Sequence, residues 1–113
     1  LSDAFSALAG GVGISPSANI NPESGLGVFE ANHGSAEDIA GQDKANPCSL
    51  ILSGAMLLEF CDWQSAADLV HQAVQGAIAQ QEVTFDLARL LPKAKLVGTQ
   101  RFAEKMIACM DLV

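Results

Sequence analysis

Basic residues are scarce in this chain, and tyrosine is absent from it. Six of the 113 residues are Lys or Arg, against 13 Asp or Glu, and the formal net charge is −7. A protein that binds the phosphate backbone of nucleic acid needs a basic patch, and the sequence shows none. The charge balance therefore argues against a nucleic-acid partner.

Long apolar runs are also missing. The longest, residues 50–60, is too short and too interrupted to cross a bilayer, and no signal peptide is visible. Half of the residues are hydrophobic and 17% are charged, which is typical of a folded domain and not of a disordered segment. We expect a protein without a membrane partner, in the cytoplasm or, in a eukaryote, in the mitochondrial matrix.

The cysteines and histidines are few and scattered. Cys48, Cys61 and Cys109 are odd in number, lie in apolar helical patterns and lack metal-ligand spacing, so we expect buried free thiols in a reducing compartment. His71 falls on the polar side of a helical pattern, and His33 has no Ser or Cys placed as a conventional nucleophile. The pattern supports neither nucleophilic catalysis nor a zinc site.

Strand-like segments come first in the chain and helical segments later. Ser2 or Asp3 is expected to cap a helix that ends near residue 9. Strands are expected at residues 12–14 and 26–31, with turns at residues 15–19 and 21–25. Two strands are too few for a self-sufficient sheet, so we expect them to pair with strands outside this chain.

Three longer helices are predicted in the second half. Asn46 caps and Pro47 opens the first, which runs to about Cys61 and is apolar on nearly every side, so we expect it to be buried. The second starts at Asp62, and the third is capped by Thr99; a segment of about one helical turn, residues 83–89, lies between them. The predicted apolar faces of the last two helices are Ala66, Leu69, Val70, Ala73, Val74, Ala77 and Ile78, and Phe102, Ala103, Met106, Ile107 and Met110.

The glycines of residues 10–13 do not form a dinucleotide fingerprint. The Rossmann pattern needs a strand, then G-x-G-x-x-G, then a helix whose N-terminus faces the pyrophosphate. Counting from Gly11, the third glycine position is Pro16, and a strand is expected after Gly13. These glycines are better explained as a helix stop and a tight turn.

The polar loop of residues 29–47 carries the groups best suited to binding a ligand. His33 offers a flat ring, and Gly34 lets the backbone approach a ligand closely. The amide of Asn46 matches the donor and acceptor of an adenine edge. Glu37 and Asp38 are suited to ribose hydroxyls and would repel a 2′-phosphate. These residues fit a solvated loop, in which Asn46 is only a helix cap, equally well.

Four motifs give the chain a resemblance to a known family. They are L-S-D-A at residues 1–4, G-G-V-G-I-S-P-S-A-N-I at 10–20, F-E-A-N-H-G-S-A at 29–36 and A-G-Q-D-K-A-N-P at 40–47. Together they resemble the β-decarboxylating dehydrogenases, which act on isocitrate, 3-isopropylmalate and homoisocitrate. The resemblance covers all 113 residues. It implies an α/β, isopropylmalate dehydrogenase-like fold, of which this chain is the C-terminal part of the large domain, with short strands followed by helices.

The resemblance implies an adenosine site made by the polar loop. By position, the cofactor-binding residues would be His33, Gly34, Ser35, Ala36, Glu37, Asp38, Ile39, Asn46, Phe85 and Arg89. NADP-dependent isocitrate enzymes typically have Lys and Tyr at the positions of Asp38 and Ile39, and Tyr at that of Phe85. Arg89 keeps the basic residue of those enzymes, and Glu37 replaces a usual Pro. Three of the four determinants favour NAD, so the sequence predicts NAD over NADP.

The resemblance also implies the reaction. Several motifs, including V-T-F-D-L-A-R-L at residues 83–90, look most like isocitrate dehydrogenase, which converts isocitrate to 2-oxoglutarate and CO₂ in the tricarboxylic acid cycle. Asp3 would be one ligand of Mg²⁺ or Mn²⁺. The catalytic Tyr and Lys of the family lie upstream, so no catalytic residue is expected in this chain. Expressed alone, the chain is expected to be inactive, and the intact enzyme to be a homodimer.

Two alternatives stay open. A sister enzyme that acts on 3-isopropylmalate or homoisocitrate would share the loop, because the cofactor is common to the family. A truncated or regulatory subunit without activity would keep part of the fold and lose cofactor binding.

Overall fold

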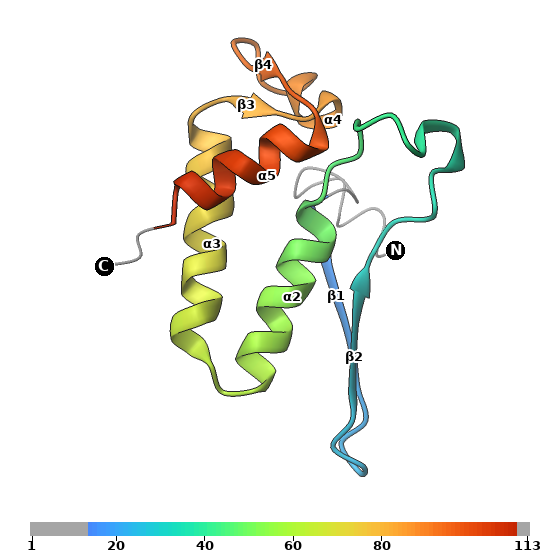
Figure 1. The fold of residues 1–113 in the computed structure, drawn as a ribbon. Coiled ribbons are helices and arrows are strands. Elements are labelled where there is room, and N and C mark those ends of the chain that lie inside the picture. Colours follow the sequence, from blue (N-terminus) through green and yellow to red (C-terminus); the bar gives the residue numbers. More distant parts are fainter. Residues whose placement is uncertain (1–13, 111–113) are drawn as a thin grey trace.

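The computed structural model describes residues 14–110 as an antiparallel hairpin packed on a layer of helices (Figure 1). In chain order the elements are β1 (Pro16–Ile20), β2 (Gly27–Ala31), the 3₁₀ turn η1 (Glu37–Ile39), α2 (Cys48–Phe60), α3 (Gln64–Ala79), β3 (Glu82–Val83), α4 (Phe85–Ala88), β4 (Lys95–Leu96) and α5 (Thr99–Ala108). The α/β class is confirmed. The helix expected at residues 2–9 lies outside the described residues.

The hairpin differs from the prediction in its first strand. Residues 15–19 were predicted to be a turn, but Pro16–Ile20 is a strand paired with Gly27–Ala31, with Ala18 opposite Phe29. Pro16 stands at the first position of the strand, where a missing N–H costs little. Of the strand predicted at 12–14, only Ile14 is described, and it lies in a turn.

The second strand and the hairpin turn of residues 21–25 are confirmed. Asn21 accepts the N–H of Glu23 on its side-chain oxygen at 2.9 Å, and Gly25 takes a φ of 76° that favours glycine. The loop closes where Asn21 donates its N–H to the carbonyl of Leu26.

Two serines of α2 dock this helix on the hairpin. Ser49 donates its hydroxyl to the carbonyl of Ser15 at 2.6 Å and accepts the N–H of Asn32 at 2.8 Å. One turn later, Ser53 donates to the carbonyl of Glu30 at 2.7 Å and accepts the N–H of Ser17. Both serines are fully buried. Because buried hydroxyls need partners, these bonds fix the hairpin against one side of α2.

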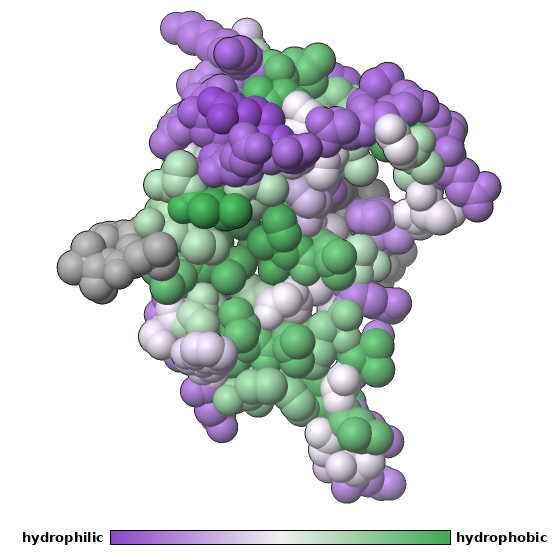
Figure 2. Space-filling model, viewed as in Figure 1, coloured by the Kyte–Doolittle hydropathy of each residue, from purple (hydrophilic) through white to green (hydrophobic). Residues whose placement is uncertain are grey.

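The prediction that α2 is buried on nearly every side was wrong for the described part of the chain. Leu50 is 59% exposed, and Leu57 and Phe60 are also exposed. Figure 2 shows apolar residues gathered over the part of this face where the helices lie. The apolar composition correctly predicted a helix. It did not show which faces of that helix other parts of residues 14–110 cover.

The core lies between α3, α5 and the short β3–α4 segment. It contains Cys48, Ala73, Val74, Ala77, Val83, Leu87, Phe102 and Met106. The predicted apolar faces of α3 and α5 are largely confirmed, but Ile107 is 64% exposed. The second helix starts at Gln64 and not at Asp62, because Asp62 has a φ of 59° and reverses the chain between α2 and α3.

The strands β3 and β4 pair in parallel, Glu82 opposite Lys95 and Val83 opposite Leu96. The sequence did not predict them, because two residues are too few to show an alternating pattern. The single helical turn expected between Val83 and Arg89 is confirmed as α4. This small sheet holds α4 above the start of α5, as Figure 1 shows.

The cysteines do not share one environment. Cys48 is buried as predicted, and burial, with a smaller effect of the nearby Asp86 carboxylate, raises the pKa of its thiol to about 12. Cys61 is exposed and Cys109 half-buried, so the prediction of three buried thiols was wrong for these two. Within residues 14–110, no helix is both long enough and apolar enough to cross a membrane.

Candidate functional site

The polar loop leaves β2 at Asn32 and reaches α2 at Asn46, and it arches past α4 and the start of α5 (Figure 1). Its tip is held by short local bonds. Ile39 donates its N–H to the carbonyl of Ala36 at 3.1 Å, and the Gln42 side chain donates to the carbonyl of Asp38 at 2.9 Å. The tip therefore has a defined shape of its own, built around η1.

Asn46 ties the end of the loop to α2 and to α4. Its Oδ1 accepts the N–H of Cys48 at 2.9 Å, and its Nδ2 donates to a carboxylate oxygen of Asp86 at 3.0 Å. Asp86 in turn accepts the hydroxyl of Thr84 at 2.7 Å. Asn46 thus bonds the first N–H of α2, as the predicted cap would, but the helix begins at Cys48 and its N-cap position is Pro47, one residue later than predicted. Its adenine contact stays a prediction, and the side chain that was expected to make it is 7% exposed and already bonded inside the protein.

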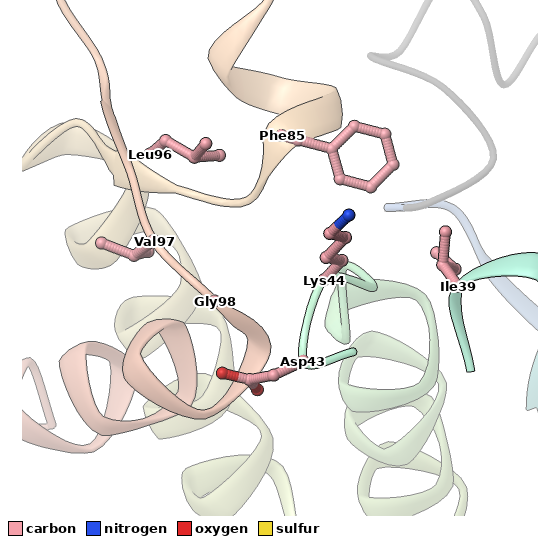
Figure 3. Close-up of a pocket in the computed structure, with 7 residues that line it drawn as sticks. All are labelled: Ile39, Asp43, Lys44, Phe85, Leu96, Val97 and Gly98. Carbon is pink, nitrogen blue, oxygen red and sulfur yellow. The ribbon is translucent and has the colours of Figure 1, made fainter. Parts of the chain in front are cut away.

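A pocket of about 480 Å³ lies between the loop, α4 and the start of α5 (Figure 3). Its lining residues are Ile39, Asp43, Lys44, Phe85, Leu96, Val97 and Gly98. Phe85 and Ile39 lie on the same side with the Lys44 amine between them, and Leu96 and Val97 lie across from them. An apolar pocket of this size with one cationic group suits a flat ring that carries a negatively charged substituent.

A second pocket, of about 290 Å³, lies along the same stretch of loop. It is lined by His33, Ser35, Ala36, Ile39, Ala40, Gly41, Asp43, Lys44, Ala45 and Thr99. Ile39, Asp43 and Lys44 border both pockets, so the two form neighbouring parts of one surface. The structure thus brings together five of the ten predicted cofactor residues: His33, Ser35, Ala36, Ile39 and Phe85.

The other five predicted cofactor residues line neither pocket. They are Gly34, Glu37, Asp38, Asn46 and Arg89. Glu37 and Asp38 are exposed within η1, and Arg89 is exposed at the end of α4. The cofactor-binding role of these ten residues stays a prediction, and the sequence did not establish which side chains of the loop line a pocket.

Lys44 and Asp43 border both pockets but were not predicted as site residues. Local sequence patterns could not place Lys44 in the pocket, because its pocket neighbours Leu96 and Val97 are more than 50 positions away in the sequence. The position of Lys44 within A-G-Q-D-K, inside the binding loop, was the one available indication.

The predicted metal ligand Asp3 lies outside the described residues. Within residues 14–110, no group of three or more His, Cys, Asp or Glu side chains is arranged to hold a metal ion. The role of Asp3 stays a prediction.

With this geometry established, comparisons with known proteins identify the family. A model of the family described as isocitrate/isopropylmalate dehydrogenase matches residues 1–106, almost the whole chain. The chain belongs to this family. Isocitrate dehydrogenase [NADP] from Coxiella burnetii is 51% identical over 107 residues, which cover 95% of this chain and 25% of that protein. The resemblance inferred from the motifs is confirmed.

Solved structures agree. The crystal structure of isocitrate dehydrogenase from Methylococcus capsulatus superimposes with a TM-score of 0.84 at 39% identity, over 95% of this chain and 30% of that one. A β-decarboxylating dehydrogenase from Thermococcus kodakarensis, in its apo form, gives 0.80 at 37% identity, over 95% and 29%. The chain thus spans about a quarter of the length of the curated relatives it matches.

Proposed function

We propose that this chain supplies the adenosine-binding part of an enzyme that oxidises isocitrate with a dinucleotide and releases CO₂, giving 2-oxoglutarate. The observation that carries the proposal is the pocket of about 480 Å³, which is lined both by the loop residue Ile39 and by Phe85 of α4. These are two positions at which the family resemblance places cofactor contacts. The names of the Coxiella burnetii and Methylococcus capsulatus relatives support isocitrate as the substrate.

The pocket residues fit one end of a dinucleotide. Ile39, Phe85, Leu96 and Val97 offer apolar walls to an adenine ring, and they keep water from its faces. The Lys44 amine stands beside the ring position and is suited to a phosphate oxygen. In the adjoining pocket, His33 and Ser35 offer polar groups to the ribose. When bound, the dinucleotide would accept hydride from isocitrate; this chain would bind and orient its adenosine half.

For the cofactor we propose NAD. Ile39 and Phe85 bring neither a hydroxyl nor a charge to the pocket, and Glu37 and Asp38 add negative charge to the loop next to it. Both features disfavour a 2′-phosphate. The relatives from Coxiella burnetii and Staphylococcus aureus, however, carry NADP in their names, which does not support the preference for NAD.

NADP is the second candidate, and the Lys44 amine favours it. Lys44 is the one Lys or Arg among the residues that line the two pockets. A cation at this place would pair with a 2′-phosphate as well as with the diphosphate.

A segment exchange tests the proposal. The 107 matching residues of the Coxiella burnetii enzyme are replaced by those of this chain, and isocitrate-dependent reduction of NAD and of NADP is measured. We expect turnover, with a higher kcat/KM for NAD than the parent enzyme has. The 113-residue chain alone is the control and should show none. A chimera that folds like its parent but oxidises no isocitrate would favour the non-catalytic alternative.

A further inference from the structure

The start of α5 is closed by a residue of the polar loop. Asp43 accepts the N–H of Thr99 on its main-chain carbonyl at 3.0 Å and the N–H of Gln100 on its Oδ1 at 2.9 Å. Thr99 was predicted to cap this helix, which is wrong: its hydroxyl donates to the carbonyl of Ala45. The first N–H groups of a helix lack partners within the helix, and a carboxylate there is also favoured by the helix dipole. The two bonds therefore bind the loop to α5.

Gly98 is required by this contact for reasons of space. A Cβ at this position would lie 2.3 Å from Oδ2 of Asp43 and 2.7 Å from its carbonyl oxygen. The φ of Gly98 is −82°, which any residue adopts, so the backbone conformation itself does not call for glycine. Any side chain at position 98 would push the loop away from α5. Asp43 itself has a φ of 56°, a left-handed conformation that Asp and Asn tolerate better than most residues.

This contact lies at the border of the candidate site. Asp43 borders both pockets, and its neighbour Lys44 extends into the larger one. Ile39 lies on the loop side of that pocket, whereas Leu96 and Val97 lie on the side that leads into α5. A loop released from α5 would carry Ile39 and Lys44 away from the opposite wall.

We propose that Asp43 is a positioning residue for the dinucleotide: by closing the N-terminus of α5, it holds Ile39 and Lys44 against the Phe85 side of the pocket. The inference rests on the proposed function, and it adds a residue that need not touch the cofactor. A loop that is held in its binding conformation in advance binds a ligand more tightly, because it is not ordered at the expense of binding free energy.

The test compares four single variants of the chain by titration with NAD and with NADP. D43A removes the carboxylate, D43N keeps an acceptor at the same place, and G98A displaces an intact Asp43. D68A is the matched control, since it removes a carboxylate bonded to Gln64 on α3, away from the pockets. Amide hydrogen exchange of residues 33–42 and far-UV circular dichroism accompany each titration.

We expect D43A and G98A to raise the Kd for both dinucleotides about tenfold and to speed exchange in residues 33–42. D43N should restore both values to within about threefold, and D68A should match the wild type. If D43A fails to fold, the comparison of G98A with D43N decides. A wild-type Kd in D43A or G98A, even with faster exchange, would overturn the positioning role. A D43N variant as weak as D43A would also overturn it. A wild-type chain that binds neither dinucleotide would instead overturn the proposed function, and with it this inference.

Discussion

The hairpin and the polar loop are both joined to helices by hydrogen bonds from side chains, yet the two junctions differ in exposure. Ser49 and Ser53, which hold the hairpin, are fully buried, whereas Asp43, which holds the loop to α5, is exposed. A buried group that loses its hydrogen-bond partner cannot bond to water instead, so removing the hydroxyl of either serine lowers the stability of the whole fold. The groups of an exposed hydrogen bond can bond to water instead, so breaking the bonds of Asp43 changes mainly the position of the loop. Fold stability and site geometry therefore depend on different contacts of this chain.

The largest expected effect is on the free energy of unfolding and comes from a substitution in the hydrophobic core. Phe102 is fully buried between α3 and α5. We expect Phe102→Ala to lower the free energy of unfolding by about 3–5 kcal/mol, because it removes a buried ring and leaves a cavity. Ile107→Ala, on the same helix but at an exposed position, should change it by less than about 0.5 kcal/mol. Equal losses in urea unfolding would show that α5 does not pack as described.

The hairpin junction is expected to show the next largest effect. Ser53→Ala leaves the N–H of Ser17 and the carbonyl of Glu30 without their buried partner. We expect a loss of about 1–3 kcal/mol. Ser65→Ala makes the same chemical change at an exposed position of α3 and should be nearly neutral. If urea unfolding gives the same midpoint for both variants, the hairpin is not held by α2 as the structure indicates.

The loop should respond in binding and not in stability. Asp38→Lys with Ile39→Tyr replaces a negative charge by a cation and adds a hydroxyl at the pocket wall. We expect the ratio of the Kd values for NADP and NAD to shift about tenfold or more toward NADP, with the unfolding midpoint nearly unchanged. Asp68→Lys on α3 carries the same change of charge and controls for long-range electrostatics. An unmoved ratio in the double variant would mean that the loop does not meet the adenosine end.

The smallest effect is expected from the ion pair between β3 and α5. A hydrogen bond from the Lys105 ammonium, assisted by the charges of Lys105, Lys95 and Arg101, lowers the pKa of Glu82 from its ordinary value of 4.5. The folded state therefore favours ionised Glu82, and this stabilisation is present above the ordinary pKa and is lost as the pH falls through the lower folded value.

Thermal unfolding followed from about pH 6 to about pH 3 measures this contribution. Over this pH range the melting temperature of the wild type should fall further than that of Glu82→Gln, which has no carboxylate to protonate at position 82. Glu104→Gln, in an exposed pair with Arg101, should follow the wild type. Parallel curves for the wild type and Glu82→Gln would contradict the assignment.

The comparison also explains what the sequence revealed and what it did not. Local patterns predicted the start of α2 at Asn46-Pro47 and the apolar face of α3, because capping and helical spacing involve neighbours in the chain. They failed for β1, where Ser-Pro-Ser resembles a turn but pairing with β2 and the bonds to Ser53 produce a strand. They also failed for Asp43, whose partner Gln100 is 57 residues away.

The candidate site shows the same limit. The resemblance named Ile39 and Phe85, which line one pocket, whereas the orientation of Lys44 into that pocket and the exposed position of Glu37 and Asp38 depend on how the loop folds around η1. Such orientations follow from contacts between distant segments, which a single sequence does not show.

We propose that residues 33–45 and Phe85 together bind the adenosine end of a dinucleotide. Titration of the isotope-labelled chain with NAD, followed through its amide resonances, tests it most directly. We expect saturable shifts of the amide resonances of His33, Ala36, Ile39, Lys44 and Phe85, and none in the hairpin. Saturable binding that shifts the hairpin and leaves these residues in place would contradict it.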